Sequence, residues 1–187
     1  MSVNGFRTAV AAVLTVVMPG VLLYWLLLHP WVEFWRRLGA VRAMTILWSA
    51  VALVAAGLGW MAARGRWLAP DWGFRPGLWV CGLALLALSG VLRRRLSLHF
   101  SLRGMSGLPE LAPARHPQPL VTEGLYSRMR HPRYVQLLVA LTGWALLANH
   151  PAAYGATALW VPGIWIIARL EERELRERYG PDYDASC

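Results

Sequence analysis

Residues with chemical potential gather at two points in the last third of the chain. The first group ends in Arg130-His131-Pro132-Arg133-Tyr134, directly before an apolar run. The second group is Glu171-Glu172, with Arg169 just before it, directly after the next apolar run. Only Asn149-His150-Pro151 separates the two runs, so we predict an antiparallel helical hairpin that brings the two groups together.

These residue types suit a charged nucleoside. Pro132 fits the first position of a helix, whose free N–H groups and positive dipole end would hold a carboxylate. Glu171 or Glu172 could accept hydrogen bonds from a ribose diol, and Tyr126 or Tyr134 could pack against a purine or a sulfonium. Together these features describe S-adenosylmethionine. In a simpler interpretation, the histidine-proline pair caps a helix, the tyrosines are interfacial aromatics and the glutamates balance arginines.

The composition predicts an integral membrane protein. Of 187 residues, 57% are hydrophobic and only 16% are charged, with a mean hydropathy of +0.40. Several apolar runs approach the roughly 20 residues that cross a bilayer. The net charge of +9 comes from arginines between these runs, so we expect no nucleic-acid partner. The histidines and cysteines lack metal-ligand spacing, so we expect no metal.

The positions of the apolar runs predict an all-α fold with about five transmembrane helices. Their ranges are about 8–28, 41–63, 77–92, 134–148 and 152–168. Pro19-Gly20 should bend the first helix without ending it, and a cleaved signal peptide is the alternative interpretation of this run. Arg93-Arg94-Arg95 should end the third helix, and Gly180-Pro181 should end the fifth beyond the bilayer. We therefore divide the chain into N-terminal membrane helices (1–92) and a catalytic region (93–187).

The arginines are divided unequally between the two sides of the membrane. The segment 93–133 and the tail after the fifth helix lie on one side, and the positive-inside rule makes this side cytoplasmic. The opposite loop carries Arg64, Arg66 and Arg75 against Asp71. We therefore expect the cofactor pocket to face the cytoplasm. The absence of Lys is a hint of a high-GC bacterium, and hence of a bacterial inner membrane.

The two chemical groups closely resemble the motifs of the isoprenylcysteine carboxyl methyltransferase family, which groups with the phospholipid N-methyltransferases. The pattern is G-x-Y-x-x-x-R-H-P-x-Y over residues 124–134, followed after a hairpin by E-E-x-x-L-x-x-x-Y-G-x-x-Y over residues 171–183. The order and spacing match consistently in this part of the chain. The first three predicted helices match only in being hydrophobic.

The resemblance implies a membrane enzyme that uses S-adenosylmethionine to methylate an amphiphilic or lipidated acceptor entering from the bilayer. It also implies that the following residues bind the cofactor: Gln118, Pro119, Leu120, Val121, Tyr126, His131, Pro132, Arg133, Tyr134, Glu171 and Glu172. Arg169 would face the substrate, although its spacing differs from the eukaryotic pattern. Gln118 stands where eukaryotic members tend to have His, which weakens the case for a prenylated protein as substrate, and Ser186 stands where many members have Tyr.

Methyl transfer requires alignment of the acceptor and exclusion of water. A carboxylate acceptor is ionised near pH 7 and needs only an orienting arginine, such as Arg169 or Arg130. An amine acceptor must first lose a proton, and the sequence offers no convincing base. We therefore predict O-methylation of an isoprenylcysteine-like or other lipidic carboxylate, with phospholipid amine N-methylation as the alternative.

Two further alternatives remain open. A sterol-type reductase that uses NADPH carries a similar R-H-P-x-Y segment, but its distal acidic motif differs, so Glu171-Glu172 favours the methyltransferase. A non-catalytic membrane scaffold would need only the basic charge, through which it would bind anionic lipid head groups.

Overall fold

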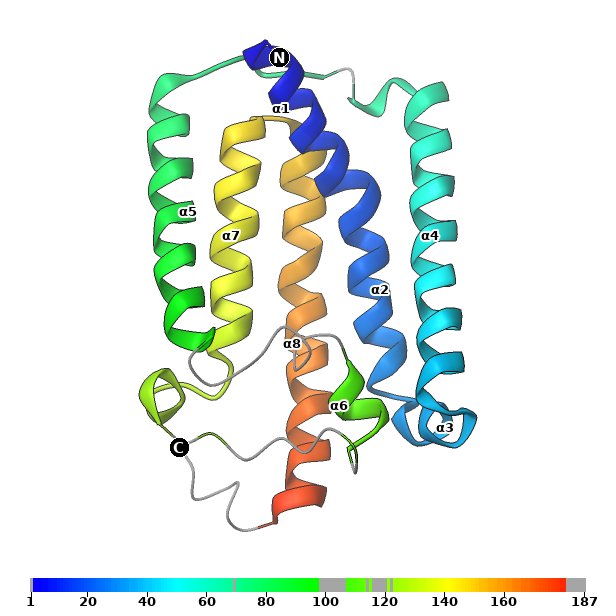
Figure 1. Ribbon diagram of the computed structural model, residues 1–187. Helices are drawn as coiled ribbons and strands as arrows, with labels where there is room; N and C mark the ends of the chain where they lie inside the picture. Colours follow the sequence, from blue (N-terminus) through cyan, green and yellow to red (C-terminus); the bar gives the residue numbers. More distant parts are fainter. Residues whose placement is uncertain are drawn as a thin grey trace.

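The chain folds as a bundle of long helices that run up and down side by side (Figure 1). The computed structural model describes residues 2–68, 70–97, 107–113, 115, 121 and 123–180, without the side chains of Arg66 and Arg178. Within these residues all regular secondary structure is helical. The elements, in chain order, are α1 (Val3–Ala12), the π-helix η1 (Val13–Val17), α2 (Met18–Leu28), α3 (Val32–Leu38), α4 (Ala40–Arg64), the 3-10 helix η2 (Arg66–Leu68), α5 (Pro76–Ser97), α6 (Leu108–Leu111), the 3-10 helix η4 (Gly124–Ser127), α7 (Pro132–Ala148) and α8 (Pro151–Tyr179).

The long helices confirm the predicted membrane fold. Among the described residues, four helices are long and apolar enough to cross a bilayer: Val3–Leu28, Ala40–Arg64, Pro76–Ser97 and Pro151–Glu177. The protein is therefore an integral membrane protein. The remaining long helix, α7, has 17 residues and a length of about 25 Å, at the lower limit for a membrane span. It stands in the same bundle and forms the predicted hairpin with α8 (Figure 1).

One prediction about where the membrane helices continue or end is confirmed, and another is wrong. The first membrane helix continues through Pro19, as predicted, and the π-helix η1 precedes the proline. We attribute this wider turn to the missing N–H of Pro19 and to its ring, which crowds the preceding turn. The prediction that Arg93-Arg94-Arg95 end the third helix was wrong, because α5 continues to Ser97. Arginine is a good helix former, and its positive charge suits a helix C-terminus.

Helices α5 and α7 pack at close backbone contact. A Cβ atom added at Gly82 would lie 2.9 Å from the carbonyl oxygen of Gly143, and one added at Gly143 would lie 3.0 Å from that of Gly82. Small residues allow membrane helices to approach in this way. Nearer the start of α7, Gln136 Nε2 donates a hydrogen bond of 2.7 Å to Ser89 Oγ. These contacts hold α7 against α5 on one side while α8 packs on it from another.

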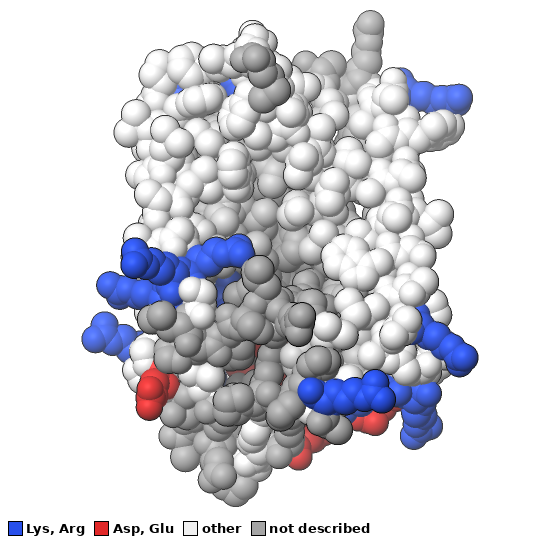
Figure 2. Space-filling model, viewed as in Figure 1, with Lys and Arg blue, Asp and Glu red and all other residues white. Residues whose placement is uncertain are grey.

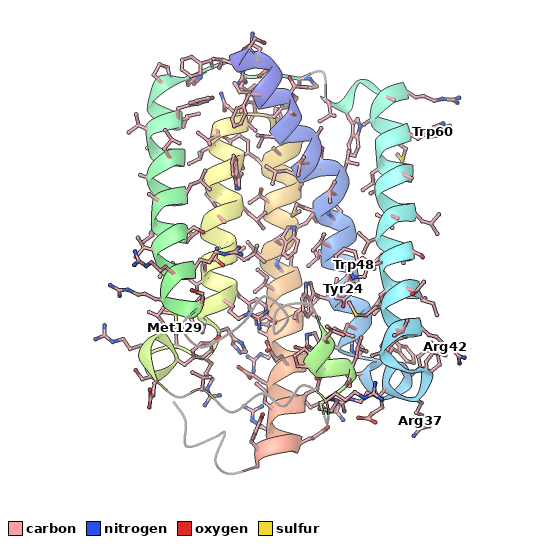
Figure 3. The ribbon with its side chains drawn as sticks, in the orientation of Figure 1. Tyr24, Arg37, Arg42, Trp48, Trp60 and Met129 are labelled. Carbon is pink, nitrogen blue, oxygen red and sulfur yellow. The ribbon has the colours of Figure 1, made fainter. Side chains whose placement is uncertain are left out.

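The main core lies between α1, α2, α7 and α8. Its buried residues include Leu22 of α2, Leu141 of α7 and Trp160 of α8. Helix α4 lies at the periphery and contacts mainly α2 and η1. There Tyr24 and Trp48 lie against each other with ring centroids 5.2 Å apart (Figure 3). Most of the side chains of α4 and α5 are not covered by protein, as expected for helices that face lipid.

A buried charge ties three segments together at the end of the bundle where α1 begins. Arg7 is only 1% exposed and pairs with Asp71 in the segment between η2 and α5. Arg7 Nε also donates a hydrogen bond of 3.1 Å to the carbonyl oxygen of Ala148, at the end of α7. His150 is buried nearby, and its pKa is lowered by burial, although the charge of Asp71 opposes the shift.

Charge is concentrated at the opposite end, which carries α3, α6, η4 and the C-terminal part of α8 and which we call the basic end. Figure 2 shows arginines and acidic residues gathered there, below a broad uncharged band. Arg37 and Arg42 lie at the basic end, whereas Trp60 lies toward the other end of α4 (Figure 3). Trp31 and Phe34 are exposed at the turn from α2 into α3, as is typical of aromatic residues at a membrane interface.

Candidate active site

The hairpin brings the two polar motifs together at the basic end. Tyr134 donates a hydrogen bond of 2.6 Å from its hydroxyl to Glu171 Oε2. His131 Nε2 lies 3.1 Å from Glu172 Oε1, and its Nδ1 lies 3.7 Å from Glu171 Oε2. The rings of His131 and Tyr134 are stacked, with centroids 5.4 Å apart. We call His131, Tyr134, Glu171 and Glu172 the hairpin cluster.

The unequal lengths of the two helices place this cluster. Helix α8 has 29 residues and α7 has 17, so the C-terminal part of α8 continues past the start of its partner. Glu171 and Glu172 lie where this continuation begins. Their side chains therefore meet the first residues of α7 just beyond the apolar part of the bundle. The carboxylates consequently lie at the end of the bundle where α7 begins.

The start of α7 agrees with the sequence in one respect and differs in another. Pro132 is the first helical residue and His131 is the N-cap, as predicted. The expected free N–H groups are only partly present, because the N–H of Tyr134 donates to the carbonyl oxygen of His131 at 3.1 Å. This 3-10 contact satisfies one of the donors that the first turn of a helix leaves unpaired. An anion bound at the start of α7 would therefore be held more by the helix dipole and by arginine side chains than by free N–H groups.

The remaining predicted residues fall into three groups. Tyr126 in η4 is half-buried, and burial raises its pKa to about 12, with Arg133 opposing and Glu171 adding to the shift. Val121, Arg130 and Arg133 are also half-buried. Arg169 is exposed and lies over the ring of Trp165, 5.6 Å from its centroid. Gln118, Pro119 and Leu120 lie outside the described residues.

A cavity of about 400 Å³ opens beside the hairpin cluster. This volume lies in the range of small-molecule sites in proteins. Glu171 belongs to both features, because it bonds to Tyr134 and also lines the cavity. The other lining residues come from the turn after α2, from α3, from the α6 region and from α8: His29, Val32, Glu33, Arg36, Pro109, Glu110, Pro113, Glu174, Leu175 and Glu177.

The cavity is acidic in a strongly basic protein. Five of the ten acidic residues of the chain line it: Glu33, Glu110, Glu171, Glu174 and Glu177. Arg36 is the one arginine among the described lining residues, and it already forms an ion pair with Glu33. Burial raises the pKa of Glu110, although the charges of His29 and Arg133 oppose the shift. This lining therefore favours a cationic ligand and disfavours an anionic one.

Two buried polar atoms belong to residues of the cavity wall. His29 is 4% exposed, and within the described ranges neither its Nε2 atom nor Glu110 Oε2 has a hydrogen-bond partner. Buried polar atoms are normally paired, so such groups at a cavity indicate a place for a polar ligand. Sequence analysis did not find His29, Glu110 or Glu174. The one available signal was a histidine directly after the first apolar run, at the expected depth of the lipid head groups.

The chain was compared with protein families, curated proteins and solved structures. A family model described as phospholipid methyltransferase matches residues 78–182. No curated protein and no solved structure matches the chain. The matched region begins near the start of α5 and includes the hairpin cluster and Glu110. It excludes α1 to α4, and with them His29 and Arg36.

Proposed function

The chain belongs to the phospholipid methyltransferase family, and from this premise we propose that it methylates the amino group of a phospholipid head group at the basic end of the bundle. Methyltransferases of this family use S-adenosylmethionine, and the four apolar helices make this chain an integral membrane enzyme of that kind. The expected relation to the isoprenylcysteine methyltransferases therefore holds at the level of membrane methyltransferases in general. The next question is which chemical group of the lipid accepts the methyl group.

The acidic cavity is the observation that carries this choice of acceptor. A lipid ammonium would be attracted by Glu110, Glu171 and Glu174, whereas a carboxylate would be repelled by them. Two arginines were expected to orient a carboxylate, and neither lines the cavity: Arg169 is exposed over Trp165 on α8, and Arg130 is half-buried before α7. We therefore favour N-methylation, which the sequence suggested only as an alternative, over O-methylation of a lipidic carboxylate.

The hairpin cluster fits the methyl donor. When bound, S-adenosylmethionine supplies an electrophilic methyl group on sulfur, so the amine forms an N–C bond as the S–C bond breaks. Glu171 would hold the ribose hydroxyls, because a carboxylate can accept more hydrogen bonds than the one from Tyr134. Arg133, with the dipole of α7, would hold the carboxylate group. The stacked rings of His131 and Tyr134 would pack against the base.

The position of the site relative to the bilayer supports a lipid acceptor. His29 follows Leu28, the last residue of the first membrane helix, so the cavity lies at the depth of the head groups. An acceptor anchored by its acyl chains could place its amine in the cavity without leaving the membrane. We further propose that the basic end faces the cytoplasm of a bacterium, because arginines crowd this end. In the same proposal, residues 93–187 form the methyltransferase region with the donor site, and residues 1–92 complete the acceptor side.

The proposal is tested by methyl transfer in reconstituted vesicles. The purified protein is given S-adenosylmethionine labelled in its methyl group, in vesicles that contain either phosphatidylethanolamine or phosphatidylcholine with a farnesylated cysteine. We expect label only in the phosphatidylethanolamine head group, in a methyl group that mild alkali does not release as methanol, and loss of the label in the Glu171→Ala variant. Gly57→Ala is the matched control, because Gly57 faces open space.

Other outcomes would refute the proposal in distinguishable ways. A product that releases methanol in alkali would be a methyl ester and would restore the carboxylate acceptor. Binding of NADPH, without binding of S-adenosylhomocysteine, would indicate a reductase. Binding of neither nucleotide would favour the alternative that the protein is a non-catalytic membrane scaffold.

A further inference from the structure

His29 occupies an unusual position for a residue next to a membrane helix. It lies in the turn after α2, with its side chain almost fully buried and its ring stacked on Trp25 at a centroid distance of 5.8 Å. Its Nδ1 lies 2.9 Å from Glu174 Oε1 on α8. Its Nε2 is buried and has no hydrogen-bond partner among the described residues, and His29 lines the acidic cavity. One ring nitrogen is therefore held by Glu174, while the hydrogen-bonding capacity of the other is unused by this part of the chain.

The contact with Glu174 fixes which nitrogen carries the proton. A carboxylate only accepts hydrogen bonds, so Nδ1 of His29 must be the donor. In the neutral imidazole, Nε2 then carries the lone pair. A carboxylate that orients a histidine and stabilises its charged form is the arrangement of general bases in many enzymes. Here the pair joins two segments that are 145 residues apart in sequence.

We propose that His29 is the general base that removes a proton from the ammonium group of the acceptor and that Glu174 is its positioning residue. This inference rests on the proposed function and supplies the base that the sequence did not reveal. One N–H bond of the ammonium breaks, its electron pair stays on the amine nitrogen, and the proton forms an N–H bond at Nε2 of His29. The neutral amine then has the lone pair that methyl transfer requires. The proton later leaves His29 for water, which restores the neutral ring.

The surroundings of His29 suit this role. Glu174 and Glu171 face it from α8, Glu110 faces it from the α6 region, and Arg36 lines the same cavity from α3. Burial lowers the pKa of His29, but the hydrogen bond and charge of Glu174, with the charges of the other two glutamates, outweigh burial and raise it. A stronger base takes a proton from an ammonium more readily. The same glutamates would hold the ammonium near Nε2.

The main test is the pH dependence of methyl transfer to phosphatidylethanolamine. For the wild-type protein, kcat/KM should rise with pH, with a midpoint above 6.5, as His29 loses its proton. His29→Gln keeps a donor toward Glu174 but has no base, so its rate at pH 7 should fall about 100-fold. Glu174→Gln removes the charge that raises the pKa, so the midpoint should move to lower pH. His150→Gln, at an equally buried histidine at the other end of the bundle, should keep the wild-type midpoint.

A second acceptor separates proton removal from a structural role. A phosphatidylethanolamine analogue whose head group ends in an aminooxy group (–O–NH2) instead of the amine is neutral at pH 7 and needs no base. His29→Gln should methylate this analogue at close to the wild-type rate. An equal loss with both acceptors would overturn the proposal, because it would indicate damage to folding or binding rather than loss of a base.

A measurement without the methyl donor completes the test. We expect short-chain phosphatidylethanolamine to shift the NMR signals of the His29 ring in the wild-type protein. Weaker binding of S-adenosylhomocysteine to His29→Gln, with an unchanged pH profile, would instead assign the cavity to the cofactor and overturn the role as base. If the wild-type protein transfers no methyl group to any amine, the proposed function itself fails. Amine methylation that is unaffected by His29→Gln would refute only the role of His29 as the general base.

Discussion

Removing the partner of a buried charge should harm this protein more than removing the charge itself. Arg7 is 1% exposed, and its guanidinium group pairs with Asp71. In Asp71→Ala, Arg7 would keep its hydrogen bonds to the Ala148 carbonyl and to Asn4 but would lose those to the Asp71 carboxylate. Leaving a buried charge without its partner costs about 3–5 kcal/mol. Because two bonds remain, we expect the lower value, about 3 kcal/mol.

The reciprocal change should be milder. Asp71 is about one third exposed, so after Arg7→Met water can solvate the carboxylate, and methionine fills much of the space of the arginine. We therefore expect a cost of about 1 kcal/mol. The double variant Arg7→Met/Asp71→Ala should resemble Arg7→Met and should be more stable than Asp71→Ala alone.

Thermal unfolding of the detergent-purified variants measures these differences. For a chain of this size, about 3 kcal/mol corresponds to a fall in Tm of roughly 6–12 °C. Burial alone would raise the pKa of Asp71, but hydrogen bonds from Arg7 and from the Gly73 N–H outweigh it and lower the pKa. The pair should therefore stabilise the fold above the ordinary pKa of 3.8 and lose this effect as the pH falls through the lower folded-state value. If the double variant is no more stable than Asp71→Ala, the assignment of the cost to the buried Arg7 charge is refuted.

Three further predictions concern the site and the packing that supports it. Tyr134→Phe removes the hydrogen bond to the Glu171 carboxylate, which is worth about 1.5–3 kcal/mol. Isothermal titration should therefore find S-adenosylhomocysteine bound at least about 10-fold more weakly. Equal affinity would contradict the proposed role of Glu171. Glu110→Gln keeps the shape of the cavity but removes a charge. The KM for phosphatidylethanolamine should therefore rise severalfold, with a smaller change in kcat. A change in kcat alone would argue against binding of the ammonium group by Glu110. Gly143→Val forces a side chain against the backbone of α5 and should cost about 1–3 kcal/mol in a melting experiment, whereas a Tm equal to that of Gly57→Ala would refute the close packing.

Local sequence signals predicted the hairpin well. A three-residue linker, Pro132 at the first helical position and Gly180 after the last helical residue each act within a few residues of where they stand. They also predicted the meeting of the two polar motifs, because an antiparallel hairpin leaves little freedom in how its ends pair. The prediction from Arg93-Arg94-Arg95 was wrong. We took these charges as the end of the helix, whereas they mark only the end of its apolar part.

The acidic cavity could not be predicted in the same way. The spacing of Glu171 and Glu174 places both on one face of α8, but nothing in the spacing says which segment lies opposite. That segment proved to be the turn at His29, which reaches α8 only because α2 packs along it in the core. Contacts of such long sequence separation depend on the packing of the whole bundle. A single sequence carries no local signal for them.

The division of the cavity wall between two regions of the chain has a consequence for how such enzymes diversify. The hairpin cluster and Glu110 lie inside the region that matches the family model, while His29 and Arg36 lie before it. In the proposed function, the matched region would supply the donor site and the glutamates that attract the ammonium, and the first helices would supply His29 and Arg36. Exchange of the first helices between relatives would therefore replace the proposed base and part of the acceptor side while the hairpin cluster stays in place.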